Sequence, residues 1–129
     1  MVPIPRVYVA GSCNISREEE GLRLAAGWMG LGLTLVAGLS FVALHVAPLI
    51  RLVIFFPALF SAVGFLQATQ HFCVNYGLKG VFNLSKDVGL TAPVTDQAAV
   101  QKDKLKSWRI LGIASLIAAA VAFLLVLAP

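Results

Sequence analysis

Three long apolar stretches dominate the chain, with polar segments between and before them. The first runs from about residue 24 to residue 47 without a charged side chain, the second from about 52 to 72, and the third from about 108 to 127. An α-helix needs roughly 20 apolar residues to cross the hydrocarbon core of a bilayer. The pattern therefore predicts an all-α integral membrane protein with three transmembrane helices.

Local signals mark where these helices begin and bend. Ser16 followed by Glu19 forms a capping-box pattern, which predicts that the first helix begins near Arg17, outside the membrane. The segment PLIR at 48–51 is the only break before the second stretch, so the first two spans are expected to form an antiparallel hairpin. Pro57 lies inside the second span and predicts a kink, because proline lacks the N–H that a helix needs.

The polar segment 73–107 divides into two parts. Its first half, GVFNLSKDVGLTAPVT, has no strong periodicity and is expected to lie along the lipid headgroups. Its second half is expected to be helical, with Thr95 or Asp96 as N-cap, and to continue into the third span as one helix of about 30 residues. We therefore expect one transmembrane domain over residues 1–129, with a polar N-terminal segment at 1–16 and an interfacial loop and helical stub at 73–107.

The basic residues predict an orientation in the membrane. Only Arg51 lies near the hairpin turn, whereas the other nine lie before the first span or within residues 73–109. Because basic residues concentrate on the cytoplasmic side, we expect the N-terminus and the 73–107 segment in the cytoplasm and the C-terminus outside. The expected location is the cell's inner (plasma) membrane, with anionic lipid headgroups near Lys102, Lys104 and Lys106.

Composition narrows the class of protein further. Charged residues make up 12% of the chain, against about 25% in soluble domains. The net charge is +4, but the basic residues flank apolar spans and form no stripe with interleaved aromatics, which argues against a nucleic-acid partner. The expected partners are other membrane protein subunits.

Small residues recur every fourth position on two of the spans. Such faces let transmembrane helices approach closely, and they predict packing against another helix of this chain or of a second one. The predicted helix-packing residues are Ala26, Gly30, Thr34 and Gly38 on the first span and Ala114, Ala118 and Ala122 on the third.

Two histidines are candidate cofactor ligands. His45 lies near the outer end of the first span and His71 near the inner end of the second. Ionisable residues within membrane segments are candidates for function, and neutral imidazole binds haem or chlorophyll well. Neither histidine has a second ligand at a diagnostic spacing, so we favour interfacial anchors and predict no cofactor, with haem or chlorophyll binding as the alternative.

Two cysteines, Cys13 and Cys73, are expected on the same side and form a possible thiol site. A metal site needs three or four ligands, and none beyond Cys73 and His71 are at hand, so no metal site is predicted. The stretch HFCVNYGLKG is expected to end the second helix, with Gly77 as C-cap. Cys73 would then lie at a helix C-terminus, which does not activate a thiol as an N-terminus does.

A family resemblance rests on the stretches NISREEEGLRLAAG and GFLQATQHFCVNYGLKGVFN. Over residues 14–83 the chain resembles small inner-membrane proteins of unknown function that also form the membrane tail of a bacterial membrane-bound rhodanese. The matching positions are Asn14, Arg23, Gly27, Cys73, Tyr76, Gly80 and Asn83. Val74 and Asn75 replace a Pro-Leu pair of the family, and Glu20 replaces an arginine. The resemblance implies a two-helix hairpin and a cytoplasmic-side cysteine linked to sulfur or thiol handling.

The sequence contains no recognisable catalytic grouping. It has no paired carboxylates within the spans, no Gly-rich phosphate loop and no nucleophile elbow, so no catalytic residue is predicted. The expected function is that of a non-catalytic accessory or structural subunit of a larger membrane complex. The alternatives are a thiol or sulfur relay through Cys73, with Cys13, and a haem- or chlorophyll-binding subunit using His45 or His71.

Overall fold

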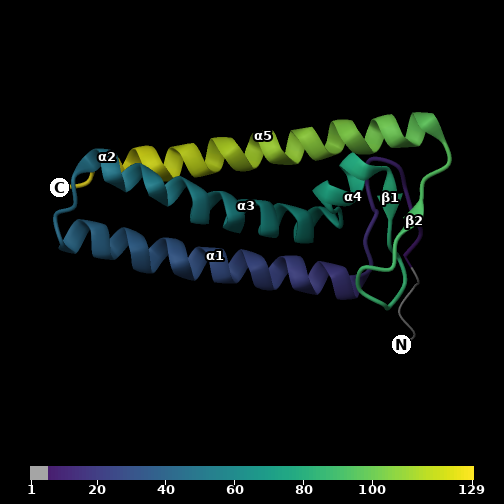
Figure 1. The fold of residues 1–129 in the computed structure, drawn as a ribbon, viewed down its shortest axis with the longest axis horizontal. Helices are drawn as coiled ribbons and strands as arrows, with labels where there is room; N and C mark the ends of the chain where they lie inside the picture. Colours follow the sequence, from purple (N-terminus) through teal and green to yellow (C-terminus); the bar gives the residue numbers. More distant parts are fainter. Residues whose placement is uncertain (1–5) are drawn as a thin grey trace.

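Three long helices lie side by side, and a small cap of short elements sits at one end of them (Figure 1). The computed structural model describes residues 6–129, so the first five residues of the predicted N-terminal segment lie outside the described part. The spans are α1 (Arg17–Ala43), the series α2 (Pro48–Arg51), η1 (Leu52–Ile54) and α3 (Phe55–Gln70), and α5 (Gln97–Leu127). Each span is long and apolar enough to cross a membrane, as predicted. The chain is mostly helical, and its three long apolar helices indicate a membrane protein.

The helix ends differ from the prediction at the hairpin turn. α1 begins at Arg17 as expected, and the Ser16 hydroxyl accepts a hydrogen bond from the Glu19 amide at 3.3 Å. However, α1 ends at Ala43, and residues 44–47 turn the chain. The prediction that PLIR forms the turn is wrong: Pro48 begins α2, a position where its missing N–H costs nothing. The second span accordingly covers residues 48–70 instead of 52–72.

Pro57 is accompanied by a change of helix type. The turn just before α3 is the 3₁₀-helix η1, Leu52–Ile54. Pro57 has no N–H to donate to the carbonyl of Val53, four residues earlier, and Val53 lies within this turn. The structure thus shows a 3₁₀ turn just before the helix that contains Pro57, and the kink stays a prediction.

Arg51 joins the hairpin turn to the end of α5. Its side chain is buried; Nε donates to the Val46 carbonyl at 2.9 Å, and Nη1 donates to the carbonyls of Leu125 and Ala128 at 3.1 and 3.0 Å. The last carbonyls of a helix lack partners within it and form the negative end of its dipole. Arg51 therefore acts as a C-terminal cap for α5.

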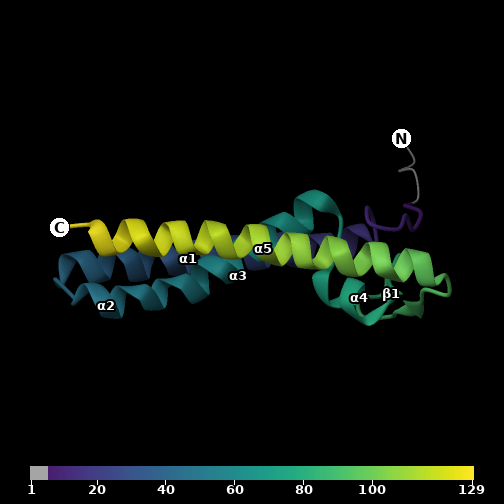
Figure 2. The same ribbon diagram turned by 90° about the horizontal axis from the view of Figure 1, so that it is seen from above.

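α5 is one unbroken helix of 31 residues, roughly 46 Å long. It begins after Asp96, whose carboxylate accepts a hydrogen bond from the Ala98 amide at 3.1 Å, so the prediction of a long capped helix is confirmed. Its apolar part begins near Ile110. The helical turns before Ile110 are polar, and the cap packs against them (Figure 2).

The cap contains structure that the sequence did not reveal. It comprises α4 (Val74–Lys79), β1 (Val81–Phe82), β2 (Ala92–Pro93) and residues 6–16. The two strands pair antiparallel, with Val81 opposite Pro93, and Ile15 forms a parallel bridge with Asn83. The segment expected to lie irregularly along the headgroups is thus folded together with the residues just before α1.

The prediction that Gly77 ends the second span is wrong. α3 ends at Gln70, and His71 takes up the left-handed conformation with φ 56°. Gly77 is buried inside α4, where an added Cβ would lie 2.2 Å from the Ser107 hydroxyl. A side chain there would separate α4 from α5.

α1 and α3 are in backbone contact through glycines. An added Cβ at Gly30 would lie 2.7 Å from the Ser61 amide, and one at Gly64 would lie 2.6 Å from the Gly27 amide. The Ser61 hydroxyl also donates to the Gly27 carbonyl at 2.8 Å. Close backbone approach with a cross-helix hydrogen bond is how helices associate in lipid. This contact accounts for Gly30 within the chain itself.

The other predicted packing residues occupy different positions. Ala114, Ala118 and Ala122 are buried on α5, which packs against α3, whereas Ala26, Thr34 and Gly38 on α1 are only half-buried. α3 packs along both long helices (Figure 1). Part of the predicted α1 ridge is therefore free to contact something else.

Gly30→Leu should disrupt the α1–α3 contact, because leucine cannot fit against the Ser61 backbone. Overpacking costs about 1–3 kcal/mol, and backbone clashes lie at the upper end. Thermal unfolding followed by circular dichroism in mild detergent should show a clear fall in Tm. Gly32→Leu is the matched control, since a Cβ at Gly32 meets nothing within 4 Å. Equal Tm values for the two variants would contradict the assigned contact.

Candidate functional site

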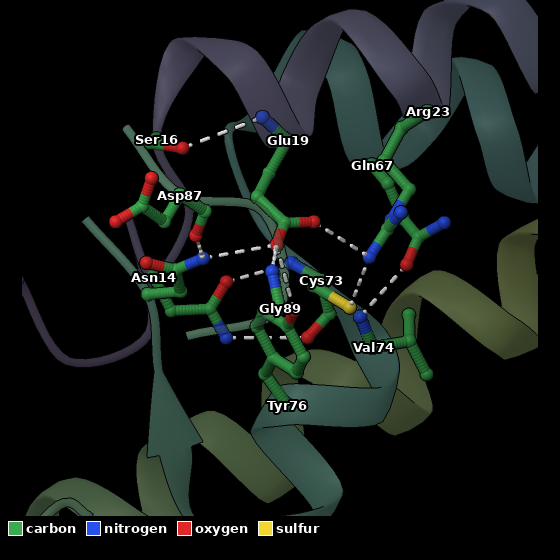
Figure 3. Close-up of polar contacts among 11 residues, drawn as sticks. Asn14, Ser16, Glu19, Arg23, Gln67, Cys73, Val74, Tyr76, Asp87 and Gly89 are labelled. Atoms are coloured by element: carbon green, nitrogen blue, oxygen red, sulfur yellow. Dashed lines mark hydrogen bonds and ion pairs between the residues drawn. The ribbon is translucent and has the colours of Figure 1, made fainter. Parts of the chain in front are cut away.

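The buried carboxylate of Glu19 lies at the centre of a polar cluster in the cap (Figure 3). Its Oε1 accepts hydrogen bonds from Tyr76 Oη at 2.8 Å, Asn83 Nδ2 at 3.0 Å and the Gly89 amide at 2.8 Å. Its Oε2 pairs with Arg23 Nη2 at 3.2 Å. Burying a carboxylate is costly unless it is paired and fully hydrogen-bonded, and Glu19 meets both conditions. Glu19 thus joins α1 to α4 and to the loop between the strands.

Only half of the predicted capping box forms. Ser16 caps α1 as expected, but the Glu19 side chain turns away from the helix end and into the cluster.

Burial, followed by the hydrogen bond to Glu19, raises the pKa of Tyr76 to about 12. Tyr76 therefore stays a neutral hydrogen-bond donor at physiological pH.

Cys73 lies against the same cluster, with its thiol buried. Arg23 Nη2 donates to Cys73 Sγ at 3.3 Å, so one guanidinium contacts both the Glu19 carboxylate and the sulfur. Cys73 is the N-cap of α4, and its expected place at a helix C-terminus is wrong. The electrostatic argument against a functional thiol, which depended on that place, no longer holds.

Asn14 holds the backbone on both sides of Cys73. Its Oδ1 accepts from the Cys73 amide at 2.7 Å, and its Nδ2 donates to the Cys73 carbonyl at 3.2 Å. The backbone of Asn14 also accepts from the Asn83 amide at 3.0 Å. These bonds fix the position of the cysteine between the N-terminal segment and α3.

The remaining predicted candidates lie apart from this cluster or at its edge. Cys13 is half-buried and forms no disulfide with Cys73. His45 is exposed in the hairpin turn, whereas His71 lies in the cap, with Nδ1 2.8 Å from Glu20 Oε2, so the two histidines lie at opposite ends of the bundle. Within residues 6–129, no group of three or more His, Cys, Asp or Glu side chains is arranged to hold a metal. Cofactor binding by either histidine stays the alternative that the sequence left open.

A second buried carboxylate belongs to Asp103, a residue for which the sequence predicts no role. It accepts hydrogen bonds from Tyr8 Oη at 2.5 Å and from the Gly11 amide at 2.7 Å, which fastens the N-terminal segment to α5. Burial, followed by the hydrogen bond to Asp103, raises the pKa of Tyr8. The Tyr8 ring also stacks on the ring of Phe82. In the sequence, Asp103 lies within KDKLK, which resembles an ordinary solvated helix surface.

An apolar groove runs along the membrane-spanning part, with α1 and α5 as its walls and with α3, followed by Ile54 of η1 toward the hairpin turn, as its floor. One section, of about 400 Å³, extends from Thr69 near the cap to Thr34 and Val121. A second, of about 340 Å³, continues from the same Thr34 and Val121 to Val42 and Ala128 near the hairpin turn. The shared residues show that the two sections adjoin, so the groove follows most of the length of the spans.

The groove offers almost no free polar group. The hydroxyls of Thr34, Ser61 and Thr69 donate to the carbonyls of Gly30, Gly27 and Phe65 at 2.7, 2.8 and 2.9 Å. The rest of the lining is aliphatic or aromatic. Its surface therefore suits an apolar occupant.

Comparison with known proteins gives no relative: no protein-family model, curated protein or solved structure matches this chain. Five of the residues that carry the resemblance nevertheless lie together in the cluster around Glu19. They are Asn14, Arg23, Cys73, Tyr76 and Asn83. Membership of that family stays a prediction.

Proposed function

We propose that the protein is a non-catalytic accessory subunit of a larger membrane complex and that its groove receives a transmembrane helix of a partner subunit. The groove between α1 and α5 is the observation that carries this proposal. It faces sideways into the bilayer, where a neighbouring helix can enter without crossing the cap.

The length of the groove favours a helix over a lipid as its occupant. The lining continues from Thr69 at the cap end to Val42 at the turn end. The hydrocarbon core is about 30 Å thick, and each lipid chain fills only one of its two leaflets. A transmembrane helix is a continuous rod through both leaflets, and its side chains can fill the whole groove.

Small residues in the groove allow a close approach. Gly38 and Thr34 lie on one wall, and Ala58, Ser61 and Ala62 lie on the floor. In lipid, association depends on packing and short backbone distances, because hydrocarbon supplies no hydrophobic driving force. Because the groove hydroxyls are already bonded, the partner helix should present an uncharged apolar face.

Gly38→Leu should weaken assembly while leaving the monomer folded. An added Cβ there meets only Leu125 Cδ1, at 3.8 Å, so leucine fits but fills the groove. Losing a contact of about 1–2 kcal/mol lowers association about tenfold. Size-exclusion chromatography after extraction in mild detergent should show wild-type protein in a particle much larger than 13.7 kDa and the variant shifted toward monomer.

Gly32→Leu is the control for added bulk on α1, because nothing lies near that position within the chain. It should assemble like the wild type. A monodisperse wild-type monomer, or a Gly38→Leu variant that assembles normally, would show that the groove is not a subunit interface.

We further propose that the chain lies in the inner membrane with its N-terminus and cap in the cytoplasm. Nine of the ten basic residues lie in the cap or on the ends of α1 and α5 nearest to it, whereas Arg51 lies at the opposite end. In intact cells, a membrane-impermeant maleimide should label a Leu49→Cys variant, since Leu49 is exposed in α2 at the far end from the cap. The variant also carries Cys13→Ser and Cys73→Ser, so that the introduced cysteine is its only thiol. Labelling only after permeabilisation would show the opposite orientation.

A second candidate function is sulfur relay through Cys73, and the contact of Arg23 with Sγ favours it. The Cys73 thiolate would attack a terminal sulfur of an inorganic polysulfide. The adjacent S–S bond would break, leaving a persulfide on Cys73 and a polysulfide one sulfur atom shorter. The Arg23 guanidinium would lie beside the negative charge of that persulfide, and the family resemblance points to the same chemistry.

Treatment with inorganic polysulfide, followed by persulfide-specific labelling and mass spectrometry, tests the relay. The relay predicts a persulfide on Cys73 that forms several-fold more slowly in Arg23→Gln than in Lys79→Gln, a basic control on the cap surface. Cys73→Ser should lose the label and keep its assembly, because a hydroxyl can still accept from Arg23. Persulfide on Cys13 alone, or none on either cysteine, would rule out the relay.

A further inference from the structure

Three basic residues share one face of α5 where the helix leaves its apolar part. Lys102, Lys106 and Arg109 follow the i, i+4, i+7 spacing that places side chains on one side of a helix. Lys104, which the sequence grouped with the other lysines, lies about 200° around the helix from Lys102. The continuous basic stripe therefore includes Arg109 and leaves Lys104 out.

The stripe is not neutralised within the described chain. The ion pairs among residues 6–129 involve Glu19 and Glu20, and none includes Lys102, Lys106 or Arg109. Asp103 is adjacent in sequence, but it is buried and receives its hydrogen bonds from Tyr8 and Gly11. All three cations are thus available to an external anion.

The position of the stripe identifies that anion as part of the membrane. From Ile110 to the end of α5 the helix has no charged residue, which gives 18 residues or roughly 27 Å, close to the hydrocarbon thickness of about 30 Å. Trp108 is 63% exposed at this boundary, where tryptophan is typical of the lipid interface. The stripe rises roughly 10 Å beyond it, which covers the headgroup layer.

We propose that Lys102, Lys106 and Arg109 form a binding site for the headgroup of an anionic phospholipid. The phosphates lie along the stripe, and the acyl chains run down the face of α5 that continues it through the exposed Ile113, about 140° around the helix from Trp108. Each basic residue near an anionic surface strengthens binding about fivefold. The site prefers anionic over zwitterionic lipid, and none of its three basic residues lines the groove.

Quenching by brominated lipids of a tryptophan placed on the face of the stripe measures this preference. The chain has two tryptophans, Trp28 and Trp108, so an Ile113→Trp variant that also carries Trp28→Phe and Trp108→Phe has a single reporter, four residues after Arg109 at an exposed position. The full-length protein is reconstituted in phosphatidylcholine vesicles that contain equal fractions of either brominated phosphatidylglycerol or brominated phosphatidylcholine. The relative binding constant at this reporter should favour phosphatidylglycerol at least fivefold, and raising the salt concentration should reduce the preference.

Matched variants separate this site from a general attraction of the protein for anionic lipid. Adding Lys102→Gln, Lys106→Gln and Arg109→Gln should bring the preference at the Ile113→Trp reporter close to one, whereas Lys79→Gln with Lys86→Gln should leave it unchanged. A Trp108→Phe variant with Ile113 intact, which leaves Trp28 as reporter on α1, should show no preference. Equal quenching by the two lipids at the Ile113→Trp reporter, or a preference that survives the triple substitution, would overturn the proposal.

Discussion

The buried carboxylate of Glu19 is the constraint on which the cap depends. An unpaired charge at that depth would cost several kcal/mol, so the fold has to bring it enough donors. The donors come from Tyr76, Asn83, Gly89 and Arg23, which are spread over 67 residues of sequence from position 23 to position 89. Satisfying one carboxylate therefore fixes the mutual positions of α1, α4 and the loop between the strands, and through Arg23 it also fixes the surroundings of the Cys73 sulfur.

The membrane-spanning part is held by a different kind of interaction. Between α1 and α3 the decisive contacts are backbone against backbone at Gly27, Gly30 and Gly64, with one hydroxyl bond from Ser61. These contacts are short-ranged and join only the facing sides of α1 and α3, so they leave the space between α1 and α5 open. The same small residues that make the hairpin tight thus leave a groove beside it, and the possible functions divide between this groove and the thiol in the cap.

The features that the sequence predicted well depend on local signals. Three apolar lengths, the Ser16 cap and the long α5 beginning after Asp96 follow from composition and from residues within one or two helical turns. The cap was missed because its bonds join distant residues, such as Tyr8 to Asp103, and because buried Glu19 and Asp103 look like ordinary surface charges in the sequence. The error at Gly77 has a similar origin: a glycine in a polar stretch suggests a helix end, whereas this one is required by the closeness of Ser107.

The guanidinium of Arg51 has a consequence for the biosynthesis of the protein. Two of its carbonyl partners, Leu125 and Ala128, are synthesised more than 70 residues after it. While only the hairpin has entered the bilayer, Arg51 must keep its charge in contact with water or headgroups, because its acceptors on α5 do not yet exist. Arrival of the third span buries this charge and completes the end of α5 in one event. The hydrogen bonds that Arg51 donates to the end of α5 thus favour the packing of the last helix against the first two.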